Sequence, residues 1–139
     1  MPAKLAPDRH RGLIVASGAL TPPERAAEML TRVFAQLAPQ SRAVVIAAGD
    51  GDDHDGDIEM LLREAGANDV RRTLLRTRAD SDQRALLDAI DHAELVLLQT
   101  DQPLRLSTLV GGTPLARALR RRNAEGMAVA GCGAAAALL

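Results

Sequence analysis

Short, continuously apolar runs alternate along this chain with longer amphipathic stretches. An uninterrupted apolar run of strand length is typical of a strand that is buried on both faces of a parallel sheet. We expect five strands, at 12–17, 42–48, 69–75, 94–99 and 127–130.

The stretches between these runs have the spacing and end signals of helices. Thr21 and Pro22 form a typical start, and Gly66 a typical end. We expect helices at 21–37, 58–65 (capped by Asp57), 80 or 81 to 90, 104–110 and 113–122, with a further helix opening after 131. The alternation predicts an α/β fold: a doubly wound, mostly parallel sheet of about five strands with helices on both faces. Ligands of such sheets bind at the carboxyl ends of the strands.

Composition excludes several classes of function. The chain has 139 residues, a length that favours a single domain, and carries a net charge of −1. It has one Phe and no Trp or Tyr, so it offers neither a basic surface nor an aromatic platform for nucleic acid. We see no apolar run long enough for a membrane span or signal peptide. A single cysteine suits the reducing cytoplasm, where we expect the protein to reside.

The turn after the last predicted strand is the strongest candidate for chemistry. A strand, a small-residue turn and a helix form the element on which many α/β hydrolases mount a nucleophile. Here the turn is Gly131-Cys132-Gly133-Ala134, without a serine. A Cys132 thiolate at a helix N-terminus would have a lowered pKa and be a good nucleophile. The stronger interpretation is a small buried residue in a tight turn.

Two charged clusters have mainly structural interpretations. The acidic loop 50–57 does not match the calcium pattern of an EF-hand, and we favour a solvated loop over a metal site formed by Asp53, His54, Asp55 and Asp57. An acidic loop at the ligand edge would also attract guanidinium groups. The arginines 120–122 end a predicted helix, and we expect them to face water. No cofactor or metal is expected.

Two segments of the last third carry a family resemblance. They are Leu104-Arg105-Leu106-Ser107 and Gly111-Gly112-Thr113-Pro114-Leu115, followed by Ala130-Gly131, Ala134 and Ala136 around the turn. In these segments the chain resembles the cyanophycinase family of serine peptidases. The resemblance implies the α/β fold of the class I glutamine amidotransferases and a cytoplasmic exopeptidase ancestry. It also implies that residues 1–139 form one domain equivalent to the N-terminal half of the family, truncated after the turn.

The departures from the family pattern bear on activity. Gly133 stands at the nucleophilic serine position, and a glycine has no side chain with which to attack a carbonyl. The family's general base histidine lies downstream of the aligned region. The family's Gly-Gly-Asp-Gln loop becomes Thr100-Asp101-Gln102-Pro103. Either Pro103 replaces the functional glutamine, or Pro103 is an insertion and Gln102 retains that role.

Two functional hypotheses follow. The first is a cyanophycinase-like protein that is inactive as a peptidase and binds peptides of arginine and aspartate through Asp101, Gln102, Arg105 and Gly131. The second is an active hydrolase that releases β-aspartyl-arginine dipeptides from cyanophycin, using Cys132 or residues of a partner chain. The uncovered apolar surface predicted near the last helix also favours a homodimer.

Overall fold

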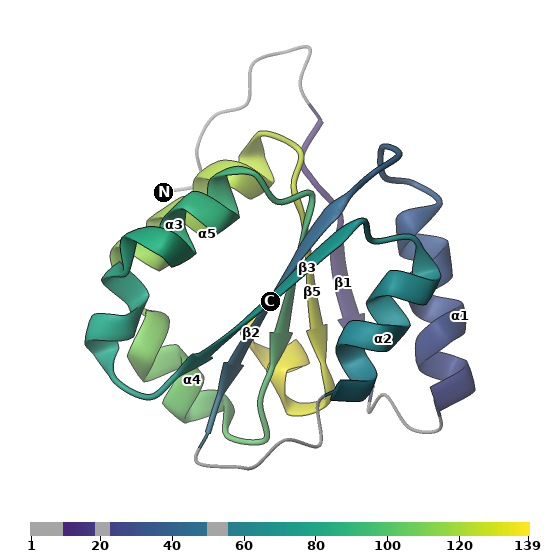
Figure 1. The fold of residues 1–139 in the computed structure, drawn as a ribbon. Helices are drawn as coiled ribbons and strands as arrows, with labels where there is room; N and C mark the ends of the chain where they lie inside the picture. Colours follow the sequence, from purple (N-terminus) through teal and green to yellow (C-terminus); the bar gives the residue numbers. More distant parts are fainter. Residues whose placement is uncertain (1–9, 19–22, 50–55) are drawn as a thin grey trace.

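The computed structural model describes residues 10–18, 23–49 and 56–139 (Figure 1). Their strands form one parallel sheet in the order β1-β5-β4-β2-β3. The strands are β1 (Ile14–Ser17), β2 (Arg42–Ala48), β3 (Asp69–Leu75), β4 (Leu95–Gln99) and β5 (Ala128–Cys132). The expected five strands are thereby confirmed, with shifts of up to two residues at their ends.

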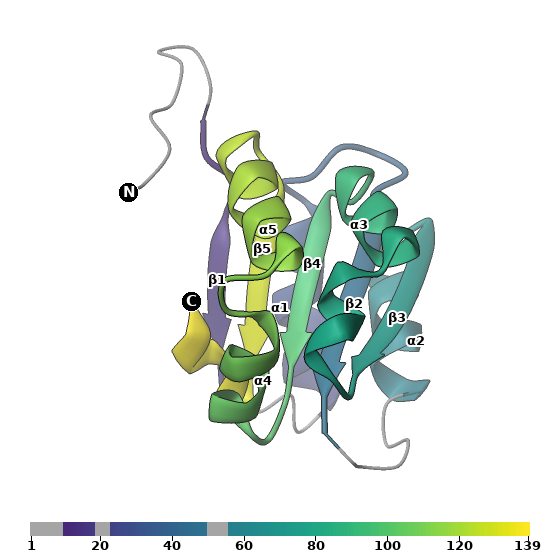
Figure 2. The same ribbon diagram turned by 90° about the vertical axis from the view of Figure 1, so that its left-hand side faces the viewer.

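Helices cover both faces of this sheet (Figures 1 and 2). One face carries α1 (Pro23–Phe34) and α2 (Gly56–Ala65), which contact each other. The opposite face carries α3 (Arg84–Asp91), α4 (Pro103–Val110) and α5 (Pro114–Ala124), with the 3-10 helices η1 (Arg78–Asp82) and η2 (Gly133–Leu138). The doubly wound α/β class predicted from the sequence is therefore confirmed.

The core has two layers because β4 and β2 are covered on both sides. Along β4, Leu95 and Leu97 pack toward α1 and α2, whereas Val96 and Leu98 pack toward α3, α4 and α5. A strand in this position needs apolar residues at every position, not only at alternate ones. This requirement explains the unbroken apolar runs from which the strands were predicted.

Two expected helix caps were wrong, and the helix expected after β5 is present but is of the 3-10 type. Asp80 and Ser81 do not cap α3 but lie inside η1, where the buried Ser81 hydroxyl donates to the Leu109 carbonyl oxygen at 2.8 Å. The helix α2 begins at Gly56, so Asp57 is not its cap. The segment after β5 forms η2, a short 3-10 helix, and not an α-helix. Each difference depends on tertiary contacts or on alternative end signals that lie close together in the sequence.

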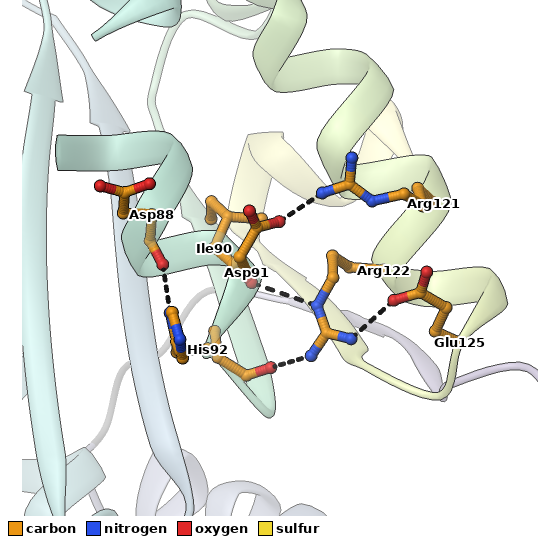
Figure 3. Close-up of polar contacts among 8 residues, drawn as sticks. Asp88, Ile90, Asp91, His92, Arg121, Arg122 and Glu125 are labelled. Atoms are coloured by element: carbon orange, nitrogen blue, oxygen red, sulfur yellow. Dashed lines mark hydrogen bonds and ion pairs between the residues drawn. The ribbon is translucent and has the colours of Figure 1, made fainter. Parts of the chain in front are cut away.

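Arg122 also departs from its expected exposure to water. Its side chain is only 22% exposed and pairs with Glu125 at 2.8 Å. The guanidinium donates to the carbonyl oxygens of Ile90, at 3.3 Å, and Ala93, at 3.0 Å (Figure 3). Carbonyls at the end of a helix lack a full set of partners within it, so a partly buried arginine from a neighbouring helix can donate to them. Arg122 thereby joins the end of α5 to the end of α3.

Candidate functional site

The carboxyl edge of the sheet brings together the segments that the sequence singled out. Gln99, at the end of β4, lies in register with Cys132 at the end of β5, and Cys132 lies in register with Ser17 of β1. The chain continues from β2 to α2 on one face and from the adjacent β4 to α4 on the other. Such a divergence between neighbouring strands is where open α/β sheets bind ligands.

The turn after β5 is built from two glycines with different constraints. At Gly131, an added Cβ would lie 2.9 Å from the Ala135 carbonyl oxygen, so only glycine lets η2 pack this closely. Gly133 has φ +57, in the left-handed region, and an added Cβ there would meet no atom of the described structure within 4 Å outside its own stretch of chain. The Gly133 N–H donates to the Gly18 carbonyl oxygen at 3.1 Å. The turn is therefore tight beneath Gly131 and sterically open at Gly133.

Cys132 lies in a different environment from the one expected of an activated thiol. It is the last residue of β5, is only 6% exposed, and packs in the layer that also contains α1 and α2. Burial raises the pKa of its thiol from 9.0 to about 11, because a thiolate loses its hydration there. The direction is opposite to the lowering expected at a helix N-terminus. At neutral pH the thiol is therefore protonated and weakly nucleophilic.

The loop after β4 is anchored by a residue that the sequence analysis did not single out. The buried Thr100 hydroxyl donates to the Ala48 carbonyl oxygen of β2 at 3.0 Å and accepts from the Gln102 N–H at 2.9 Å. It thus joins the ends of β2 and β4 where their chains diverge. A threonine after a strand carries no distinctive sequence signal, so only the fold reveals this role.

Three of the proposed substrate contacts, Asp101, Gln102 and Arg105, follow this anchor in the chain. Asp101 and Gln102 are exposed, and Pro103 is the first residue of α4, where its missing N–H costs nothing. Arg105 is half-buried in the first turn of α4. The helix α4 contacts η2, which begins at Gly133, so both segments border the same region. A carboxylate, an amide and a guanidinium at one edge suit a polar ligand with charges of both signs.

The described histidines lie at the other edge of the sheet. His92 follows α3 and precedes β4, and its Nδ1 lies 2.8 Å from the Asp88 carbonyl oxygen (Figure 3). His10 precedes β1, and its carbonyl oxygen is 3.9 Å from a Cβ built on Gly126, which precedes β5. Neither reaches the turn at the carboxyl ends. His54 lies outside the described residues.

Neither a metal cluster nor a membrane span is found in the part of the chain that the structure describes. No three His, Cys, Asp or Glu side chains converge there, and no helix there is long and apolar enough to cross a bilayer. The loop residues 50–55, including Asp53, His54 and Asp55, lie outside the described residues, as does the Asp57 side chain.

Comparisons with known proteins agree with this fold. No family model matches the chain. Two cyanophycinases, from Synechococcus elongatus and Thermosynechococcus vestitus, are each 30% identical to it over 135 residues, which is 94% of this chain and 42% of each relative. The crystal structure of a peptidase from an acI-B1 Actinobacterium superposes with a TM-score of 0.67 at 17% identity, over 88% of this chain and 54% of that one.

The fold, a doubly wound α/β sheet, is thus one that a peptidase also adopts. The chain is similar to cyanophycinases along 94% of its length, which confirms the resemblance expected from its sequence. It spans less than half the length of the cyanophycinases that it matches.

Proposed function

We propose that this chain is a cyanophycinase-like protein without peptidase activity that binds peptides of arginine and aspartate at the carboxyl edge of its sheet. The observation that carries the proposal is Gly133. By the sequence resemblance Gly133 stands at the nucleophile position of the family; it lies in a left-handed, sterically open turn and has no side chain that could react.

The surroundings of Gly133 support the same conclusion. The adjacent Cys132 is buried with its thiol protonated at neutral pH. The described histidines, His10 and His92, lie at the opposite edge, so neither is within reach as a general base. Among the described residues, the turn therefore lacks both parts of a nucleophile and base pair.

Peptide binding is supported by the charges that border the turn. Asp101 can accept hydrogen bonds from a guanidinium, and Arg105 can donate to a carboxylate. Gln102 has both an acceptor and donors for a peptide group. A β-aspartyl-arginine dipeptide carries both kinds of charge. The proposed cytoplasmic location accords with a cysteine that is free and buried.

The test combines turnover with binding in the purified chain. We expect no dipeptide release from cyanophycin by wild type or by Cys132→Ala, and measurable heat on titrating wild type with β-aspartyl-arginine. Asp101→Asn and Gln102→Ala should each weaken binding by about tenfold, as loss of one charged or polar contact predicts. Met60→Lys, on the exposed surface of α2, is the matched control that should bind normally. An absence of binding by folded wild type would refute the ligand.

The alternative function is an active hydrolase that uses Cys132 or residues of a partner chain. Dipeptide release by wild type but not by Cys132→Ala would establish a cysteine nucleophile. Release by both would indicate a reactive group supplied from elsewhere. Gly133→Ser adds a further comparison, because it would place a hydroxyl at the turn, in an open position whose left-handed backbone strains a side-chain residue.

A further inference from the structure

The two edges of the sheet differ in how they are protected (Figure 2). The edge strand β3 contains Asp69, Arg71 and Arg72, and charged side chains discourage the pairing of a further strand. The other edge strand, β1, contains no charged residue and pairs, among the described residues, with β5 alone. Two large apolar side chains lie at its start in contact with water, Leu13 at 36% exposure and Ile14 at 57%. Of the two edges, that of β1 is therefore the one that favours a further strand.

The hydrogen bonds of β1 show which of its backbone groups face outward. The Leu13 carbonyl oxygen accepts from the Val129 N–H of β5 at 2.8 Å. The N–H and C=O of one strand residue point to the same side, and those of the next residue point to the opposite side. Ile14 and Ala16 therefore direct their backbone groups away from β5, and both residues are exposed. A strand added to this edge would form its hydrogen bonds with Ile14 and Ala16.

A groove of about 420 Å³ lies beside this edge, between β1 and α1 (Figure 1). Leu13 and Val15 form its apolar wall on the strand side, and Met29 and Val33 form its apolar wall on the helix. Successive strand residues point to opposite faces, so every second residue of an added strand would lie over this groove. An apolar side chain at such a position would cover Met29, which is only half-buried, and remove its apolar surface from water.

The charges on the helix side of the groove indicate the charge of the ligand. Arg25, Glu28 and Arg32 line the groove and are exposed. Glu28 pairs with Arg32 at 2.7 Å, so two arginines stand against one glutamate and the rim is positive. An arginine has five N–H donors, so Arg32 can bind a second carboxylate without losing Glu28. The rim is therefore complementary to an acidic ligand.

The spacing of the two arginines fits an extended peptide. Arg25 and Arg32 are seven residues apart, which is about 10.5 Å along the helix axis, and Met29 lies between them. In an extended chain, residues four positions apart lie on one face at about 13 Å, and the residue midway between them lies on the same face. The long arginine side chains span the difference. An acidic, an apolar and a second acidic residue at alternate positions would thus face Arg25, Met29 and Arg32.

We propose that the β1 edge binds an extended acidic segment of another protein, which adds a strand to the sheet and has the pattern acidic-x-apolar-x-acidic. The main chain of the segment pairs with Ile14 and Ala16, and its alternate side chains lie over the groove. Recognition of this kind takes affinity from backbone hydrogen bonds and specificity from the side chains. The site shares no residue with the peptide site proposed at Asp101, Gln102 and Arg105, so each proposal can fail without the other.

The first experiment titrates a fluorescently labelled peptide, acetyl-Thr-Asp-Thr-Leu-Thr-Asp-Thr-amide, with the folded chain and follows its anisotropy. The threonines favour an extended conformation. We expect a dissociation constant between about 10 µM and about 1 mM, because the contact is short. Replacing both aspartates of the peptide by asparagine should weaken binding about tenfold, and replacing them by lysine should abolish it, because like charges then face the arginines.

Charge variants of the protein test recognition by α1. Arg25→Gln and Arg32→Gln should each weaken binding of the acidic peptide about threefold to tenfold, whereas Glu28→Gln should strengthen it about threefold, because a repelling carboxylate is removed. Arg63→Gln is the matched control, since it removes the same charge from the exposed surface of α2 and should leave the affinity unchanged. All four substitutions are at exposed helix positions, and circular dichroism confirms that each variant is folded.

Amide hydrogen exchange tests the addition of a strand. Bound peptide should slow exchange at Ile14 and Ala16, whose N–H groups face outward, and leave exchange at Val129 unchanged, because its N–H already donates to Leu13. Three results would each overturn the proposal. They are no binding to folded wild type up to about 1 mM, equal affinity for the lysine peptide, and binding without slower exchange at Ile14 and Ala16.

Discussion

Replacing Gly131 and Gly133 separately by alanine should have very different costs, although the two residues are in one turn. At Gly133 the cost is that of a left-handed alanine, about 1 kcal/mol, partly offset by reduced freedom of the unfolded chain. At Gly131 the new Cβ would lie 2.9 Å from the Ala135 carbonyl oxygen and 3.1 Å from the Ala136 Cα. Both are backbone atoms, so η2 must move as a unit, at a cost of about 2–3 kcal/mol.

Urea unfolding of the two variants beside wild type measures this difference. We expect Gly131→Ala to be less stable than Gly133→Ala by about 1–2 kcal/mol, which corresponds to roughly 3–6 °C in melting temperature. The slope of free energy against urea should be the same in all three proteins, because the exposed area on unfolding does not change. Equal stabilities, or a less stable Gly133→Ala, would show that the close approach of η2 to Gly131 is not present in solution.

Three further predictions concern residues outside the glycines of the turn. Arg122→Ala should destabilise the protein by about 1–3 kcal/mol, because the Ala93 carbonyl loses the guanidinium donor and the Ile90 carbonyl loses one of its donors, whereas the exposed Arg120→Ala should change stability little. Chemical denaturation measures both. Burial raises the pKa of the Cys132 thiol in the folded protein, so the thiol of the unfolded chain ionises at a lower pH. The free energy of unfolding should therefore decline as the pH rises from about 9 to about 11. Cys132→Ala should lack this decline in a pH series of thermal melts. Thr100→Val should lower the free energy of unfolding by about 1–2 kcal/mol in thermal melts, because both hydrogen bonds of the Thr100 hydroxyl are lost. The same loss should speed exchange of the Gln102 amide hydrogen. Unchanged exchange at Gln102 would refute the role of Thr100 as an anchor.

The sequence predicted the order of elements well because burial on both faces leaves a clear pattern. The bounds of β2 and β3 match the observed Arg42–Ala48 and Asp69–Leu75. In β2 the apolar run stops at Gly49, whereas β3 alternates less clearly and contains two arginines. Contacts between residues far apart in the sequence could not be predicted from it. Ser81 was an equally good helix cap in the sequence, yet its hydroxyl bonds to Leu109, 28 residues away. Arg122 could not be distinguished from its neighbours without knowing that α3 ends beside it.

In the candidate site, too, the position of an element could be predicted from the sequence but the contacts of its side chains could not. The turn at Gly131 to Gly133 could be located from the composition of small residues, and its position at the end of β5 agrees with that expectation. The environment of Cys132 could not be predicted from the sequence, because the expected helix N-terminus would lower the pKa of the thiol whereas the observed burial raises it. Which effect dominates depends on the direction in which the last residue of β5 points, and that is set by the register of the sheet.

The open position at Gly133 also offers a site for chemical labelling. A Gly133→Cys substitution would place a thiol where nothing in the described structure lies within 4 Å of its Cβ. The native Cys132 next to it is buried and protonated at neutral pH, so a thiol-reactive dye or spin label should attach to the introduced residue in preference. A reporter could thus be attached at the carboxyl edge of the sheet, beside the loop that contains Asp101 and Gln102, and would detect a ligand arriving there whether or not any bond is cleaved.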